Sequence, residues 1–268
     1  MFRKIIFDRP SPFELYLPEG PGASPLICIT PLLGRLLFLE DLLLERYLAR
    51  FFASNGFATA VIDRPIFEFN PACGLEQIQS YLEESLSRNR QVLDFLAGQK
   101  EIDSAKMGSF GISFGAVINS LWASLDSRLK AHVFALGGGN LPEIFVTSRD
   151  PLMRSYYQAA LKSKGGGVPP LTKENLKENL KKIFRFDPLK TAASIPRENV
   201  FMVLALFDRV ICFRYGLALR DALGNPRTFY LPLGHYSSIV SVPFLKRKVL
   251  SFFRSKWLLT SEPAEKIF

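Results

Sequence analysis

Five consecutive residues carry the clearest chemical signal in this sequence of 268 residues. Ser113 stands between Gly111 and Gly115, after an apolar segment with strand character and before a segment with helical periodicity. In that context the pattern Gly-x-Ser-x-Gly is typical of a nucleophile elbow, whose serine hydroxyl is exposed on a strained turn. The glycines let the helix and the strand approach without a Cβ clash. The pattern predicts that Ser113 is a nucleophile; the alternative is an ordinary glycine-rich turn.

A serine hydroxyl is a weak nucleophile until a general base removes its proton, and the sequence contains two histidines. His132 lies inside a predicted strand, where we expect a structural histidine. His235 follows the last predicted strand, which places it at the carboxyl edge of the sheet, where active sites of open α/β sheets assemble. We therefore predict that His235 is the base. The alternative is a surface loop residue.

A carboxylate is needed to fix the tautomer of the histidine and to stabilise its protonated form. Asp208 follows the predicted strand 199–206 and so belongs to the same edge of the sheet. Asp187 precedes a proline in a segment without strands, and Asp221 falls on the solvent face of a predicted helix. We predict Asp208 as the third member; the alternative is a loop carboxylate without a catalytic role.

Alternating apolar segments and helical patterns position these three residues. Strands are predicted at 25–30, 57–63, 105–110, 130–136, 199–206 and 227–233. The first predicted helix follows the strand 25–30 and ends at residue 54. Further helices are predicted at 76–97, 114–125, 173–184, 212–223 and 238–257. This order predicts an α/β fold with a parallel sheet and helices on both faces. The strandless segment 141–195, with its Gly165–Gly167 run, is interpreted as an insertion within a single domain of residues 1–268.

Composition narrows the class of protein. Hydrophobic residues make up 48% and charged residues 22%, which is typical of a folded domain and excludes disorder. The net charge of +9 comes from residues spread along the chain without a nucleic-acid-binding motif, so we predict no nucleic-acid partner. Three widely spaced cysteines favour a reducing compartment, and the most apolar stretch is too charged to span a bilayer. We expect a cytoplasmic protein without a transmembrane segment.

The order Ser113, Asp208, His235 is the order found in α/β-hydrolases. The sequence resembles this superfamily from about residue 25 to residue 236, and within it the bacterial serine esterase-like branch that carries an inserted lid. The resemblance rests on the segments 29–34, 56–64, 111–115, 135–140, 206–208 and 234–235. It implies a mostly parallel sheet of about eight strands, and hydrolysis through an acyl-enzyme. Two features depart from the superfamily: Thr30-Pro31 replaces the familiar His-Gly, and Arg209-Val-Ile-Cys212 follows the acid.

The expected reaction is acyl transfer from an ester to water, with no cofactor and no metal. The N–H of Phe114, at the start of the helix after the elbow, is one predicted oxyanion donor. Pro31 has no N–H, so the second donor is expected at Leu32 or Leu33, and Leu32 is our first choice. Gly108, Gly111 and Gly115 do not fit the pattern Gly-x-Gly-x-x-Gly, so the sequence gives little support to dinucleotide binding.

The segment 141–195 is predicted to form a lid over the carboxyl edge of the sheet. Its aromatic residues, Phe145 and Phe184 among them, either line an apolar pocket or form a small core of the lid itself. The expected substrate is a small-molecule ester or thioester with a hydrophobic moiety. Two alternatives stay open: an acyltransferase with the same triad, and a non-catalytic relative that binds lipids or a partner. In the second, the basic, Phe-rich segment 242–258 would contact an anionic membrane peripherally. The sequence does not predict the oligomeric state.

Overall fold

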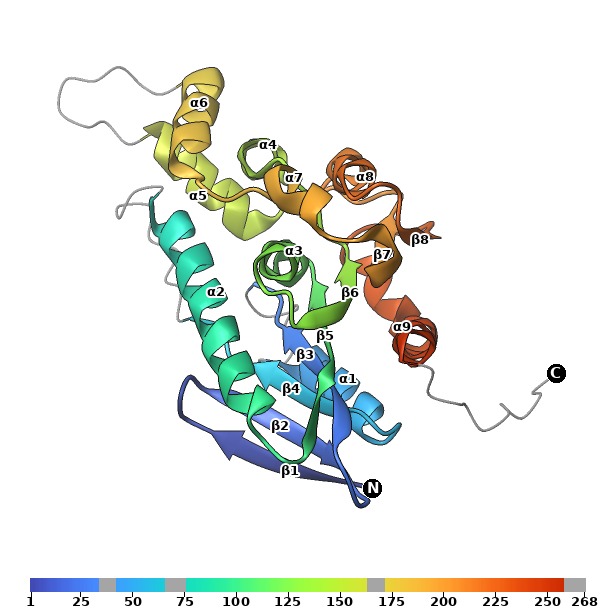
Figure 1. Ribbon diagram of the computed structural model, residues 1–268. Helices are drawn as coiled ribbons and strands as arrows, with labels where there is room; N and C mark the ends of the chain where they lie inside the picture. The colour runs from blue at the N-terminus through green and yellow to red at the C-terminus, as the bar shows by residue number, and fades with distance from the viewer. Residues whose placement is uncertain (34–41, 66–75, 163–171, 258–268) are drawn as a thin grey trace.

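The computed structural model describes residues 1–33, 42–65, 76–162 and 172–257 (Figure 1). Its eight-stranded sheet has the order β1-β2-β4-β3-β5-β6-β7-β8. Strands β3 to β8 run parallel, β2 is antiparallel to β4, and β1 is antiparallel to β2. This confirms the predicted mostly parallel sheet. The strands are β1 Phe2–Phe7, β2 Phe13–Pro18, β3 Ser24–Thr30, β4 Ala58–Ile62, β5 Ile102–Ile112, β6 Leu129–Ala135, β7 Val200–Ala205 and β8 Arg227–Leu231.

Helices cover both faces of the sheet. Side chains of β3 alternate between two apolar clusters, Leu26 and Cys28 facing α2 and α3, Ile27 and Ile29 facing α1 and α9. This alternation is what a parallel sheet buried on both sides requires. The helices are α1 Leu43–Ala53, α2 Glu76–Ala97, α3 Phe114–Leu125, α4 Leu141–Thr147, α5 Pro151–Lys162, α6 Lys173–Ile183, α7 Pro188–Thr191, α8 Phe213–Ala222 and α9 Val242–Lys256.

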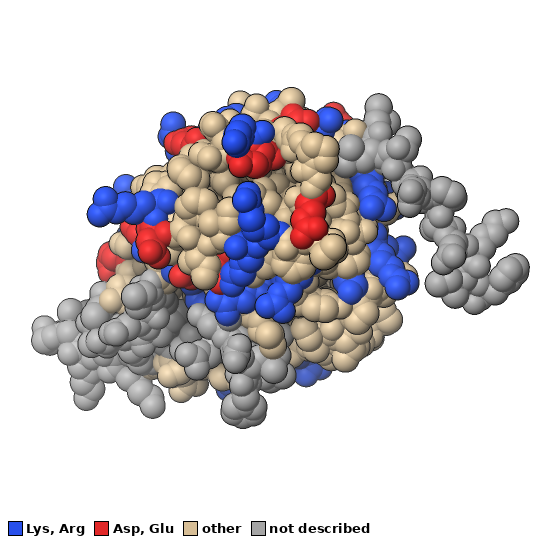
Figure 2. All heavy atoms as spheres, turned by 90° about the horizontal axis from the view of Figure 1, so that it is seen from below, with Lys and Arg blue, Asp and Glu red and all other residues tan. Residues whose placement is uncertain are grey.

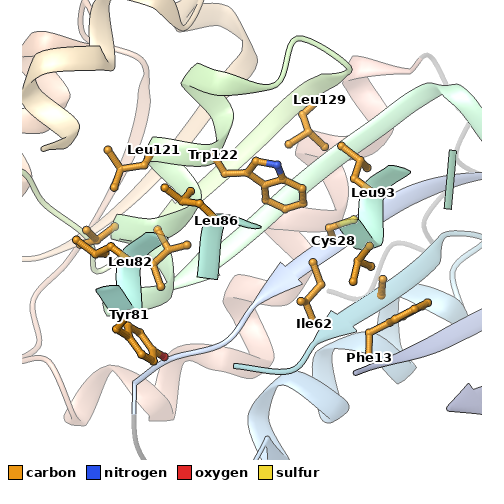
Figure 3. Packing of buried hydrophobic residues seen from close by; sticks show 14 of the residues in the cluster. Phe13, Cys28, Ile62, Tyr81, Leu82, Leu86, Leu93, Leu121, Trp122 and Leu129 are labelled. Atoms are coloured by element: carbon orange, nitrogen blue, oxygen red, sulfur yellow. The ribbon is translucent and has the colours of Figure 1, made fainter. Parts of the chain in front are cut away.

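The apolar stripe predicted along residues 76–97 packs against the sheet. Figure 3 shows Leu86 and Leu93 of α2 and Trp122 of α3 gathered over the strand residues Cys28 and Ile62. The stripe follows helical spacing, so its side chains share one face of α2 and are buried together. This packing fixes α3, and therefore the turn that precedes it, relative to the sheet.

Several boundaries differ from the sequence-based expectations for physical reasons. The antiparallel hairpin β1–β2 was not predicted, because β1 is an edge strand whose Arg3 and Lys4 are exposed and hide its alternation. The predicted helix 238–257 is a 3₁₀ segment, Ser237–Ser241, followed by α9. Pro243 lies in the first turn of α9, where its missing N–H costs nothing; within one continuous helix it would remove a hydrogen bond.

The insertion contains more structure than expected. Residues 141–195 hold α4, α5, α6 and α7, where the sequence predicted only the helix that corresponds to α6. Helices α4, α5 and α6 contact one another and lie together at the end of the molecule above α2 and α3 (Figure 1). The Gly165–Gly167 run and residues 34–41, where the first predicted helix would begin, lie outside the described residues. None of the helices in the described ranges has the length and apolar character needed to cross a membrane.

His132 is a structural histidine of β6, as its place in a strand predicted. It is 2% exposed, and its Nδ1 lies 2.9 Å from the Ser109 hydroxyl oxygen. Burial, with a smaller effect from the positive charge of Lys256, lowers the pKa of His132 to about 3. The imidazole is therefore neutral in the folded protein at neutral and mildly acidic pH.

This histidine should make the protein sensitive to acid. In the unfolded chain a histidine has a pKa of about 6.5, so between that pH and about 3 the unfolded state binds a proton that the folded state does not. The free energy of unfolding therefore falls as the pH is lowered, by up to about 1.4 kcal/mol per pH unit from this group. Urea titrations from about pH 7 to about pH 4 should give a shallower dependence for His132→Gln than for the wild type. If the free energy of unfolding falls equally steeply with pH in both proteins, His132 does not cause the loss of stability in acid.

Candidate active site

Ser113 sits on the turn that joins β5 to α3. Its backbone has φ 58° and ψ −125°, a conformation that side-chain-bearing residues rarely adopt, and its N–H donates to the Ala135 carbonyl at 2.8 Å. A Cβ on Gly111 would lie 2.3 Å from the Gly115 carbonyl oxygen, and one on Gly115 would lie 2.4 Å from the Thr30 carbonyl oxygen. Both positions therefore require glycine, and the close packing holds the strained turn in place.

The structure brings Ser113, His235 and Asp208 together. The Ser113 Oγ lies 2.8 Å from His235 Nε2, and His235 Nδ1 lies 2.6 Å from Asp208 Oδ2. The side chains of His235 and Asp208 are 8% and 3% exposed. The other carboxylate oxygen, Asp208 Oδ1, accepts the N–H groups of Val210 at 2.8 Å and Ile211 at 3.0 Å. Because an ionised Asp208 can only accept, Nδ1 carries the proton and Nε2 is left to accept the serine proton.

Two neighbouring loops at the carboxyl edge of the sheet place the acid and the histidine. Asp208 follows β7, and His235 follows β8, which pairs with β7. Leu206 donates to the Leu231 carbonyl at 2.8 Å, and Phe207 donates to the Leu233 carbonyl at 3.0 Å, so the pairing continues beyond the strands. This extension fixes the two loops against each other, and through them the acid against the imidazole.

The competing carboxylates have other roles. Asp187 accepts the N–H groups of Asn140, Leu141 and Leu189 at 2.6–2.9 Å, and so links the first turns of α4 and α7. Asp221 is exposed on α8, as predicted, and contacts Arg220. Among the described residues no cluster of three or more His, Cys, Asp or Glu side chains could hold a metal ion.

The two predicted oxyanion donors differ in their surroundings. Phe114 is the first residue of α3, and the first N–H groups of a helix have no partner within the helix. The Leu32 N–H, in contrast, donates to Glu45 Oε1 at 3.0 Å, and Glu45 is only 2% exposed on α1. The Leu32 N–H, which the sequence suggested as the second oxyanion donor, is thus already hydrogen-bonded to a buried carboxylate. Sequence reasoning missed Glu45, because a glutamate in a helix with many charges resembles a solvent-facing residue.

Two apolar cavities meet at Ser113. The smaller, of about 130 Å³, extends between the sheet and the helices α1 and α9; the larger, of about 380 Å³, extends between α3 and the insertion helices α4 and α5. Both are lined by Leu33, Ser113, Asp150, Val210 and Tyr236. The Tyr236 hydroxyl donates to Asp150 Oδ2, and burial followed by this hydrogen bond raises the pKa of Tyr236.

The described aromatic residues of the insertion line the larger cavity or pack into the main core, not into a core of the lid itself. Phe145 and Phe184 are buried in the cluster shared with α2 and α3, and with Met153 they also line the larger cavity. Tyr157 and Phe186 pack against that cluster without lining the cavity. The side chains of Tyr156 and Leu161, which the sequence also suggests for the pocket or the lid, are not among those that the structure describes.

Basic side chains are spread over the surface. Figure 2 shows Lys and Arg distributed over the face it presents, with acidic residues among them. On α9, the segment considered above for membrane contact, the apolar side chains of Val249, Leu250, Phe252 and Phe253 are buried against the sheet. The Lys246 ammonium lies 4.4 Å from the centroid of the Tyr47 ring, so this cation is engaged with an aromatic ring of its own chain.

Comparisons with known proteins identify the fold. No protein-family model matches the chain, and no curated protein matches its sequence. Among solved structures, an acetyl xylan esterase from Paenibacillus sp. R4 has a TM-score of 0.65 at 17% identity, covering 95% of this chain and 88% of that one. Est1E from Butyrivibrio proteoclasticus has 0.64 at 15% identity, covering 95% and 99%. The alpha/beta hydrolase GrgF from Penicillium sp. sh18 has 0.63 at 13% identity, covering 97% and 100%. The chain has the α/β-hydrolase fold.

Proposed function

We propose that this protein is a serine hydrolase that cleaves carboxylic esters or thioesters with a hydrophobic moiety through an acyl-enzyme on Ser113. The observation that carries the proposal is the continuous chain of contacts from the Ser113 hydroxyl through His235 to the buried Asp208 carboxylate. Such a chain has the geometry of general-base activation of a nucleophile. The apolar linings of both cavities at Ser113 support a hydrophobic substrate.

In the proposed reaction, His235 Nε2 accepts the Ser113 proton as Oγ attacks the carbonyl carbon. Asp208 stabilises the imidazolium that forms, and His235 then donates its proton to the departing alcohol oxygen. A water molecule, activated by the same imidazole, hydrolyses the acyl-enzyme and restores the serine. The serine proton leaves with the alcohol, and a proton from the water passes through Nε2 to the Ser113 Oγ, so the triad ends the cycle unchanged.

The Phe114 N–H is the first proposed oxyanion donor, and the second is reassigned within the loop after β3. Leu32 would have to break its 3.0 Å hydrogen bond with Glu45 before it could donate to a substrate. Leu33 borders both cavities together with Ser113, whereas Leu32 borders only the smaller one. We therefore assign Phe114 and Leu33 as the pair, and Glu45 as a residue that anchors the loop at Leu32. Removal of one such donor costs roughly 10²–10³ in kcat in other enzymes.

The insertion 141–195 is proposed to act as a lid within one domain of residues 1–268. Leu141, Ile144 and Phe145 of α4 and Met153 of α5 border the larger cavity opposite Ser113 and Phe114. Helices in this position exclude water from the acyl-enzyme and shape the bound substrate. The Asp150–Tyr236 hydrogen bond ties the start of α5 to the residue after His235.

A fluorophosphonate tests the proposal directly, because it reacts with activated serines. We expect a single adduct per chain by intact mass, located at Ser113 by peptide mapping. Protein that has been heat-unfolded before exposure is the control and should gain no adduct, since the triad geometry is then lost. A folded protein that stays unlabelled at every probe size, including the smallest, would refute an activated Ser113.

A further inference from the structure

The smaller cavity has the form of a slot between a helix pair and the sheet. One wall is formed by every fourth residue of α1, namely Leu44, Leu48 and Phe52, and the opposite wall by Val242, Leu245 and Val249 of α9. These spacings place each trio on a single helix face. The floor is formed by sheet residues: Phe110, Ile112, Ala135, Val203 and Leu231. We call this cavity the helix–sheet slot.

The slot is long, narrow and mostly apolar, with most of its polar groups at one end. Leu44 and Phe52 are eight residues apart, or about 12 Å of helix, while the volume is only about 130 Å³. Most of the polar lining side chains follow strands at the carboxyl edge of the sheet or lie in the 3₁₀ segment after β8: Ser113, His235, Tyr236 and Ser238. Asp150 is added from the residue before α5, and Lys246 from the second turn of α9. Both helices run from that edge toward the other, so Phe52 and Val249 lie deeper than Leu44 and Val242. Such a shape fits an unbranched aliphatic chain better than a ring or a branched group.

The chemistry decides which part of an ester enters the slot. His235 lines the slot and not the larger cavity, whereas Phe114 lines the larger cavity and not the slot. His235 must protonate the departing alkoxide oxygen, so the alcohol part of the ester lies on the His235 side. The acyl part remains bonded to Ser113 beside the Phe114 N–H, on the side of the larger cavity.

We propose that the helix–sheet slot binds the alcohol part of the substrate, and that this enzyme prefers esters of unbranched aliphatic alcohols with a larger apolar acid. The inference rests on the proposed function. In the acylation step the Ser113 Oγ–carbon bond forms and the carbon–alkoxide bond breaks. The serine proton passes through His235 to the alkoxide, and the neutral alcohol leaves the slot. Water then takes its place as the second nucleophile.

A series of esters of one acid tests the substrate preference. From ethyl to butyl to hexyl esters, kcat/KM should rise about 4-fold for each methylene that becomes buried, until the slot is full. The cyclohexyl and tert-butyl esters should fall at least about 10-fold below the linear esters of equal carbon number. A series that is flat in alcohol length, or that favours the branched isomers, would overturn the inference.

Two matched tryptophan variants test the assignment of the cavities. Leu245 lines only the slot and Met153 lines only the larger cavity, and each is a half-buried apolar residue. We expect Leu245→Trp to lower the ratio of kcat/KM for the hexyl ester to that for the ethyl ester about 10-fold. Met153→Trp should leave this ratio unchanged. It should instead lower the ratio of kcat/KM for an ester with a long acyl chain to that for one with a short acyl chain. If Leu245→Trp does not fold, Ile239→Trp fills the same slot from the neighbouring 3₁₀ segment.

The order of the two chemical steps gives an independent readout. Esters of one acid share the same acyl-enzyme, and the slot is empty of alcohol once it forms. Under deacylation-limited conditions Leu245→Trp should therefore change kcat/KM and not kcat, whereas Met153→Trp should change both. Fluorophosphonate labelling of both variants separates the two proposals. If both variants react with the fluorophosphonate and hydrolyse esters, but Met153→Trp and not Leu245→Trp changes the dependence on alcohol length, only the slot assignment is refuted. If the wild-type protein neither reacts with the fluorophosphonate nor hydrolyses esters, the proposed function is refuted as well.

Discussion

Replacement of Ser113 by alanine is expected to lower kcat by about 10⁶-fold on any ester that the wild-type protein hydrolyses, a loss like that of other enzymes without their nucleophilic serine. In the proposed mechanism the Ser113 Oγ is the atom that bonds to the carbonyl carbon, and the strained turn at φ 58° holds its backbone in place. What remains in the variant is the effect of the oxyanion donors and of substrate binding on attack by water, roughly 10³-fold over the uncatalysed reaction.

A second serine of the same strand provides the matched control. Ser109 Oγ lies 2.9 Å from His132 Nδ1, so the molecule contains two serine–histidine pairs. The Ser109 pair is fully buried, and the pKa of its histidine is lowered to about 3. Ser109→Ala should therefore keep kcat within about 3-fold of the wild type, although it leaves His132 without this contact. Steady-state kinetics on a chromogenic ester measures both variants; more than about 1% residual kcat in Ser113→Ala would contradict a nucleophilic role.

The two histidines occupy different positions relative to the strands, and for this reason the sequence alone could distinguish the candidate base from the structural histidine. His132 sits inside the apolar run of a strand that is buried on both faces, and His235 follows a strand in a loop that begins with Gly234. Strand position determines which edge of a parallel sheet a loop reaches, so residues far apart in sequence can be assigned to one site from local patterns alone. The positions of Ser113, Asp208 and His235 depend on such local signals, and the structure brings the three together.

Other features depend on contacts that no local pattern reveals. The Glu45–Leu32 hydrogen bond joins α1 to the loop after β3, and it occupies the N–H that the sequence suggested as an oxyanion donor. Helices α4 and α5 are short, and they are stabilised by packing on α6 and on the cluster shared with α2 and α3. Tertiary packing, not intrinsic propensity, accounts for most of the stability of short helices. The cavities are likewise spaces between elements, so their shape follows from the assembled fold.

Asp208→Asn should lower kcat by about 10⁴-fold while the fold is retained, as for the same change in a serine protease triad. The structure supplies the reason. Asp208 Oδ1 accepts two backbone N–H groups, from Val210 and Ile211, so an asparagine keeps its oxygen there and turns its NH₂ group toward His235. Nδ1 must then accept a hydrogen bond, and the ring proton moves to Nε2. The ring thus donates toward Ser113 instead of accepting its proton.

Asp187→Asn is the matched control, because Asp187 is an equally buried carboxylate whose two oxygens accept three backbone N–H groups. An amide there places NH₂ against an N–H, so this variant should lose thermal stability and keep its kcat. Asp208→Asn should show the reverse, with a melting temperature close to that of the wild type. The kcat of each variant relative to the wild type, measured together with melting curves on the same preparations, separates the effect on catalysis from the effect on stability. A kcat for Asp208→Asn within about 10-fold of the wild type would assign the orientation of His235 to another residue, because the tautomer would then be set without Asp208.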